Sequence, residues 1–135
     1  MGAGLFVLAV LLAGLPLVER AAKTAREGMS DWVERYEQRF IAVRQELPSG
    51  AILGYLSDSP ADDDARAYFM AQYALAPVVL TRDLQGRQLI LGNFVSGRVD
   101  PDLLRGLGLI LARDFGNGVV LLRLDPERQD RKSGG

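Results

Sequence analysis

The first 18 residues constrain this chain most strongly, because Met1 to Val18 contains no charged and no hydrogen-bonding side chain. As a helix, the segment is roughly 27 Å long at about 1.5 Å per residue. A bilayer core of about 30 Å needs an apolar helix of nearly that length. A helix in a small soluble domain shows a polar side to water, and this segment has none. We therefore expect Met1 to Val18 to be a single transmembrane anchor.

A cleaved signal peptide is the main alternative for this segment. No Lys or Arg precedes the apolar run, and its end, Leu15 to Glu19, offers no small-x-small cleavage site, so we favour an uncleaved anchor. Arg20, Lys23 and Arg26 come after the span, and the positive-inside rule then favours a cytoplasmic C-terminal part. A signal-anchor commonly exports the domain that it carries, so counting residues leaves the side of the membrane open.

The segment Glu19 to Leu47 is predicted to form one long stalk helix that ends before Pro48. Its apolar residues recur at alternating spacings of four and three, which places them on one stripe: Met29, Val33, Tyr36, Phe40, Val43 and Leu47. Fewer than three full heptads favour packing on the following domain. The same spacing would also serve a partner's helix or a homodimer.

Residues 48–124 predict a small α/β domain. A strand at Ala51–Leu56, a helix at Asp62–Ala76 and a strand at Val78–Thr81 form a β-α-β unit, whose strands pair in parallel by default. Three more strands are expected, at Gln88–Val95, Leu109–Arg113 and Val119–Arg123. The last two form a C-terminal β-hairpin, since Asn117-Gly118 between them supplies the positive φ angles of a tight turn.

The expected fold is therefore a five-stranded mixed sheet in a two-layer or three-layer α/β domain. One capped turn of helix is predicted at Asp100 to Gly106, with Asp100 as N-cap and Pro101 as the first helical residue. Residues 125–135 are charged and end in glycine, and are predicted to be a disordered tail. Because the strands are apolar nearly throughout, we expect the Asp62–Ala76 helix on one face of the sheet and the stalk or a partner on the other.

The Asp62–Ala76 helix is itself apolar on most sides, which is unusual for a helix that covers one face of a small domain. Its outer side is a candidate contact with another protein. The predicted partner-binding residues are three aromatic residues of this helix and two of the stalk stripe: Tyr68, Phe69, Tyr73, Tyr36 and Phe40.

Acidic residues gather at the carboxyl end of the first strand, where open α/β sheets usually bind ligands. Asp58, Asp62, Asp63 and Asp64 would supply oxygen ligands for Mg²⁺. A simpler interpretation is that Asp62 to Asp64 stabilise the positive end of a helix dipole and that Asp58 caps the loop. We favour the simpler one because no phosphate-binding loop accompanies the acids. Asp58, Asp62 and Asp63 remain the only metal candidates, with the metal unknown.

Composition excludes most catalytic classes. The chain has no Cys and no His, so thiolate nucleophiles, cysteine-ligated metals and histidine triads are absent. The net charge of −1 argues against a nucleic-acid partner, which would need a basic face. Dinucleotide, nucleotide and hydrolase motifs are also missing. We expect a protein that is not an enzyme and that holds no cofactor.

Three segments of the chain resemble a group of uncharacterised bacterial envelope proteins: Tyr68 to Val79, Leu91 to Phe94 and Arg113 to Val119. The resemblance covers roughly Tyr36 to Leu124. Members of that group have one N-terminal span and a small α/β domain, and accompany polytopic glycosyltransferase-like or polysaccharide-assembly membrane proteins. The resemblance implies an accessory domain on the periplasmic side of the inner membrane, and it carries over no catalytic residue.

The resulting expectation is a single-pass accessory or interaction protein of the bacterial cell envelope, which docks a larger membrane protein. Two alternatives remain. The first is a metal-binding or sugar-nucleotide-binding module or enzyme built on Asp58 and Asp62 to Asp64. The second is a structural homodimer formed through the stalk helix.

Overall fold

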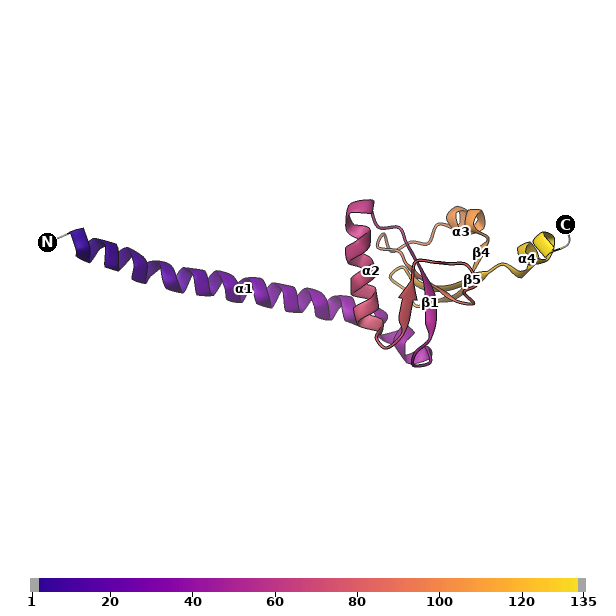
Figure 1. The fold of residues 1–135 in the computed structure, drawn as a ribbon, viewed down its shortest axis with the longest axis horizontal. Helices are drawn as coiled ribbons and strands as arrows, with labels where there is room; N and C mark the ends of the chain where they lie inside the picture. Colours follow the sequence, from indigo (N-terminus) through magenta and orange to yellow (C-terminus); the bar gives the residue numbers. More distant parts are fainter. Residues whose placement is uncertain (1–2, 134–135) are drawn as a thin grey trace. The chain divides into compact units, whose positions relative to one another are not determined.

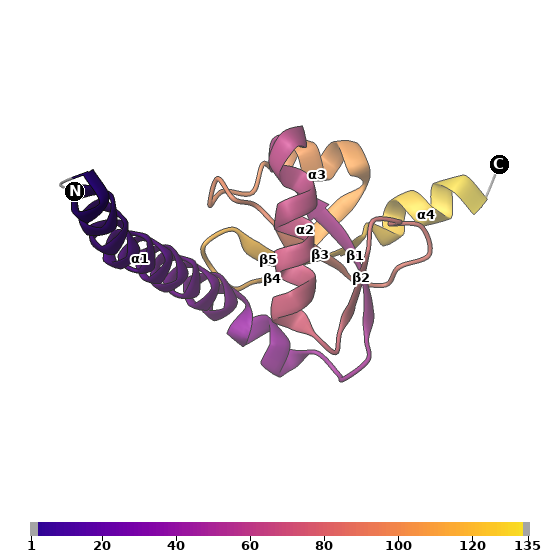
Figure 2. The same ribbon diagram turned by 60° about the vertical axis from the view of Figure 1, so that its left-hand side comes forward.

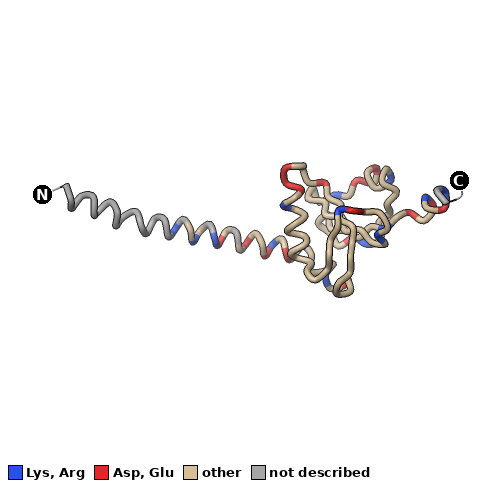
Figure 3. The backbone as a smooth tube through the Cα atoms, in the orientation of Figure 1, with Lys and Arg blue, Asp and Glu red and all other residues tan. Residues whose placement is uncertain are grey.

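The computed structural model describes residues 3–133, and side chains from Arg20 onward except those of residues 21, 25, 29, 132 and 133. The chain divides into two compact units, Met1–Arg35 and Tyr36–Gly135. The first unit is the part of helix α1 (Ala3–Glu46) that precedes Tyr36. Its described charged side chains are first basic and then mostly acidic (Figure 3): Arg20, Lys23 and Arg26, then Glu27, Asp31, Glu34 and Arg35.

The predicted membrane span lies outside the part of the chain whose side chains are described. Among the described residues, no helix is both long and apolar enough to cross a membrane. Met1 to Val18 and the stripe residue Met29 fall outside that set. The span therefore stays a prediction from the sequence.

The second unit is built on a mixed sheet (Figure 1). Its described strands lie in the order β2-β1-β3-β5-β4. The strands are β1 (Ile52–Ser57), β2 (Val79–Thr81), β3 (Ile90–Asn93), β4 (Leu109–Asp114) and β5 (Val119–Leu124). β1 pairs in parallel with β2 and with β3, whereas β5 pairs antiparallel with β3 and with β4. These pairings confirm the α/β class, the five-stranded mixed sheet, the β-α-β unit and the C-terminal hairpin.

The start of α3 follows the predicted cap. α2 (Ala61–Leu75) connects β1 to β2, and α3 (Pro101–Leu107) precedes β4. The carboxylate of Asp100 accepts a hydrogen bond of 2.9 Å from the backbone N–H of Asp102, and Gly108 ends α3 in the left-handed conformation. In the hairpin, Asn117 has a φ of 54°, as a tight turn requires.

The C-terminal segment differs from the disordered tail that the sequence predicts. Residues Pro126–Ser133 form helix α4. Asp125 starts this helix, because its carboxylate accepts a hydrogen bond of 3.0 Å from the N–H of Glu127, and proline fits the first helical position.

α1 and α2 cover the same face of the sheet, which corrects the expectation that the stalk would cover the opposite face. Figure 2 shows α2 crossing in front of the sheet. One core contains residues from α1, α2 and the strands β1, β2, β3 and β5, among them Phe40, Val43, Ala71, Leu75, Leu53, Leu80, Leu91 and Leu121. The other face is covered by Leu104 of α3, over Ile90, Val120 and Leu122. Residues 47–51 connect α1 to β1, and the end of α1 packs with α2 in the same core.

The predicted boundary between stalk and domain also shifts. The compact unit begins at Tyr36 and not at residue 48. Phe40 and Val43 are fully buried, and Tyr36 and Leu47 pack against the same core. The last three turns of α1 are therefore part of the α/β body.

Candidate functional site

Helix α2 positions the candidate site, and its sequence explains both its ends. Asp62, Asp63 and Asp64 occupy its first turn, where negative charge is stabilised by the helix dipole. No Gly or Pro interrupts the helix before Pro77. One side is buried against the sheet through Ala67, Ala71, Ala74 and Leu75, and these small residues let the helix lie close to the strands.

The outer side of α2 carries two exposed aromatic side chains. Phe69 is 67% exposed and Tyr73 is 64% exposed. They lie four residues apart and so occupy neighbouring positions on one side of the helix. We call Phe69 and Tyr73 the aromatic patch. Aromatic residues left in water on a helix are typical of contact surfaces.

Tyr68 supports this patch from within the domain. Its hydroxyl donates a hydrogen bond of 2.7 Å to the carbonyl of Leu80. Its ring meets Tyr55 edge-on, with centroids 5.2 Å apart, and meets Phe69 with centroids 5.6 Å apart. The guanidinium of Arg82 lies 4.8 Å from the Tyr68 ring centroid. Tyr68 therefore supports the ring of Phe69, and Tyr68 itself is only partly exposed.

The two stalk candidates have structural contacts. Phe40 is 0% exposed, so it has no surface to offer a partner. Tyr36 is partly buried, and its hydroxyl donates a hydrogen bond of 3.3 Å to the carbonyl of Ala67 in α2. Of the five predicted docking residues, the structure places Phe69 and Tyr73 together at the surface and uses the other three to hold α1, α2 and the sheet together.

Asn93 at the end of β3 is a buried polar centre that sequence reasoning missed. It is 0% exposed, and its Nδ2 donates hydrogen bonds of 3.0 Å to the hydroxyls of both Tyr36 and Tyr55. Burial raises the pKa of each tyrosine above its usual range, and the Asn93 hydrogen bond only partly offsets this rise. The signal in the sequence is a single amide within an apolar strand, which predicts a hydrogen-bonded core position.

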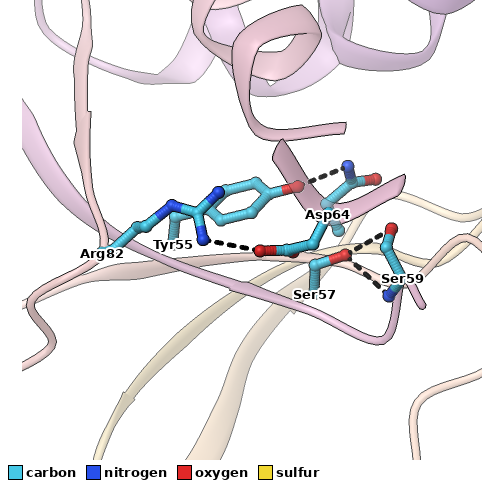
Figure 4. Close-up of polar contacts among 6 residues, drawn as sticks. Tyr55, Ser57, Ser59, Asp64 and Arg82 are labelled. Atoms are coloured by element: carbon cyan, nitrogen blue, oxygen red, sulfur yellow. Dashed lines mark hydrogen bonds and ion pairs between the residues drawn. The ribbon is translucent and has the colours of Figure 1, made fainter. Parts of the chain in front are cut away.

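Polar residues also meet beyond the carboxyl ends of β1 and β2 (Figure 4). Arg82 Nη1 lies 2.6 Å from Asp64 Oδ2. The Ser57 hydroxyl donates to Ser59 Oγ at 2.9 Å and accepts from the Ser59 N–H at 3.0 Å. Each group has a partner inside the cluster, so these contacts order the loop between β1 and α2.

The acidic candidates do not form a metal site in the described part of the chain. Asp58 accepts hydrogen bonds from the N–H groups of Val95 at 2.6 Å and Ser96 at 3.3 Å, so it caps the loop after β3. Asp62 and Asp63 are exposed in the first turn of α2. No group of three acidic side chains able to hold a metal ion occurs among the described residues. Asp58 thus bonds backbone N–H groups, and Asp62 and Asp63 lie where a helix dipole favours negative charge.

Each edge of the sheet has a feature that disfavours an added strand. At β2, Gln72 of α2 accepts a hydrogen bond of 2.7 Å from the N–H of Leu80 and donates one of 2.8 Å to the carbonyl of Val78. The amide of Gln72 thereby replaces the backbone of a neighbouring strand. At β4, the register shifts between Leu111 and Arg113, and such a bulge disfavours edge pairing.

No family model matches this chain, and comparisons with curated proteins and with solved structures find no significant similarity. The function has to be inferred from the chain's own residues.

Proposed function

We propose that this protein is a membrane-anchored accessory protein of the bacterial cell envelope, and that its α/β body docks a larger membrane protein through the aromatic patch. The observation that carries the proposal is the exposure of Phe69 and Tyr73 on one side of α2. Burying an aromatic side chain contributes roughly 1.5–3 kcal/mol, so two of them supply a useful share of a binding energy.

The patch is suited to a rigid contact. Phe69 rests on the Tyr68 ring, and Tyr68 is fixed by its hydrogen bond to β2. A side chain that is already held in place loses little conformational entropy on binding. Tyr73 adds a hydroxyl, which lets the edge of the patch stay in contact with water.

Sheet edges that disfavour an added strand favour docking through a helix face. Strand addition needs free backbone groups, and Gln72 occupies those of β2 while a bulge disrupts β4. The aromatic patch is then the most exposed pair of large apolar side chains on a single element of the body.

The anchor would confine the body to the membrane where its partner resides. Met1 to Val18 is apolar throughout, and the charged residues after it suit a helix that leaves the bilayer. Tethering raises the effective concentration of the partner to about the millimolar range for a short linker. A patch of modest area is sufficient under that condition. The resemblance to envelope proteins favours the periplasmic side of the inner membrane.

Both alternatives lose support at the residue level. Asp58 and Asp64, which a metal or sugar-nucleotide site would use, are bonded to backbone N–H groups and to Arg82. A stalk homodimer would need the apolar stripe, yet Phe40 and Val43 are buried in the body of the same chain.

Photo-crosslinking in native membranes tests the proposal. A photoreactive phenylalanine analogue replaces Phe69 or Tyr73, and the matched control replaces Leu111, which is 49% exposed on β4. We expect one larger membrane protein to be trapped from positions 69 and 73 but not from 111. Trapping of a second copy alone, or the same products from all three positions, would contradict the proposal.

A further inference from the structure

A cleft of about 900 Å³ lies in the α/β body, apart from the aromatic patch. The turn after β2, the end of α3 and the helix α4 form its walls. Its volume lies within the range of roughly 300–1,000 Å³ that small-molecule sites have. No residue of the cleft belongs to the proposed docking surface.

The floor and the rim of the cleft differ in chemistry. Leu84, Leu107 and Leu124 line it with apolar surface. Arg128 and Arg131 of α4 stand one turn apart on its rim. Within the described residues, neither guanidinium has an ion-pair partner.

One carboxylate, that of Asp125, also borders the cleft. Its Oδ1 accepts the hydrogen bond that starts α4, so this oxygen is already occupied. The lining therefore carries two arginines without an ion-pair partner among the described residues and one carboxylate, so positive charge is in excess by one. A cationic ligand would meet repulsion from both arginines, whereas an anion would be attracted to them.

We propose that this cleft binds an amphipathic anion, with a phosphate or carboxylate group between Arg128 and Arg131 and an apolar group over the leucine floor. Arginine forms paired hydrogen bonds with such oxygens. The apolar part of the ligand supplies the affinity that two exposed arginines would not provide alone. This inference is independent of the proposed docking function.

Two variants separate the charge from the cavity. The double change Arg128→Ala and Arg131→Ala removes the rim, and Arg123→Ala on β5 is the matched control because it removes an exposed arginine that does not line the cleft. Gly106→Trp fills the cleft while both arginines remain, because a Cβ at Gly106 meets no atom within 4 Å. Replacing a helical glycine also raises helix propensity, so this variant is expected to fold.

Isothermal titration calorimetry on the full chain in zwitterionic nanodiscs tests the site with phenyl phosphate, inorganic phosphate and phenol. We expect phenyl phosphate to bind at least tenfold more tightly than either of the other two compounds. The double arginine variant and Gly106→Trp should each weaken it by about tenfold or more, and Arg123→Ala should leave it unchanged. Equal binding of phenyl phosphate and inorganic phosphate, or unchanged binding in the two cleft variants, would overturn the proposal.

Nanodiscs that contain an anionic phospholipid distinguish the source of the ligand. Loss of phenyl phosphate binding in those discs, restored when the lipid is zwitterionic, assigns the site to a lipid headgroup. Unchanged binding assigns it to a soluble anion. Absence of binding to the wild-type chain in both kinds of disc overturns the proposal.

Discussion

Replacing Phe40 by alanine should destabilise the α/β body as severely as a substitution in the middle of the sheet. Phe40 is 0% exposed within the core that α1 shares with α2 and the sheet. An aromatic side chain buries about 150–250 Å², and about 25 cal/mol per Å² converts this to about 4–6 kcal/mol. Measured Phe→Ala changes cost about 3–5 kcal/mol. We therefore expect a loss of about 4 kcal/mol, a large part of the total stability of a small domain.

Urea unfolding of the full chain in mild detergent, followed by circular dichroism, measures this loss. Ile41→Ala is the matched control, since Ile41 is the next residue of the same helix and is 48% exposed. Its cost should stay below about 1 kcal/mol. A cost below about 1 kcal/mol for Phe40→Ala as well would refute the conclusion that the end of α1 belongs to the body.

Three further changes test other parts of the structure. Gln72→Leu removes the amide that bonds the outer edge of β2, so it should cost about 1–3 kcal/mol in urea unfolding and cause concentration-dependent self-association in size-exclusion chromatography. Gly118→Ala places a Cβ against the carbonyl oxygen of Phe94, at a φ of +77°, and should cost more than about 3 kcal/mol. Gly86→Ala, at a φ of +69° with open space around the new Cβ, should cost about 1–2 kcal/mol. Because burial raises the pKa of Tyr36 and Tyr55 above the ordinary 10.0, the folded state holds these protons longer than the unfolded state. The contribution of these two tyrosines to the free energy of unfolding is therefore fully present below about pH 10 and is lost as the pH rises above it. Thermal melts from pH 9 to 11.5 should show this loss of stability, and the double change of both tyrosines to Phe should make the loss smaller.

Local sequence signals were sufficient for the strands and for α2 and α3, but not for α4, which the sequence predicted as a disordered tail. An intervening helix of ordinary crossover length gives parallel strands, and Asn117-Gly118 gives an antiparallel hairpin, because each connection allows few geometries. Asp100 and Pro101 define the start of α3 in the same way. In each case the cause and the effect lie within a few residues of each other.

Contacts between distant residues were not predictable from local patterns. The apolar stripe on α1 predicts a packed face, but not which side of the sheet that face meets. In the sequence, Gln72 is indistinguishable from an ordinary surface residue of a helix. Its hydrogen bonds to the backbone of β2 depend on the position of that strand beside α2. The same holds for Asn93, which needs Tyr36 from α1 and Tyr55 from β1. Long-range geometry therefore also decided which candidate docking residues stayed at the surface.

The aromatic patch on α2 is proposed to hold a larger membrane protein. Co-purification of the tagged full chain from native membranes under mild detergent tests this most directly, with Phe69→Asp, Tyr73→Asp and Leu111→Asp compared at equal expression. All three side chains are exposed, so each variant is expected to fold. We expect the partner to be lost with the first two variants and retained with Leu111→Asp. Equal recovery of the partner with all three variants would contradict the proposed docking role of the patch.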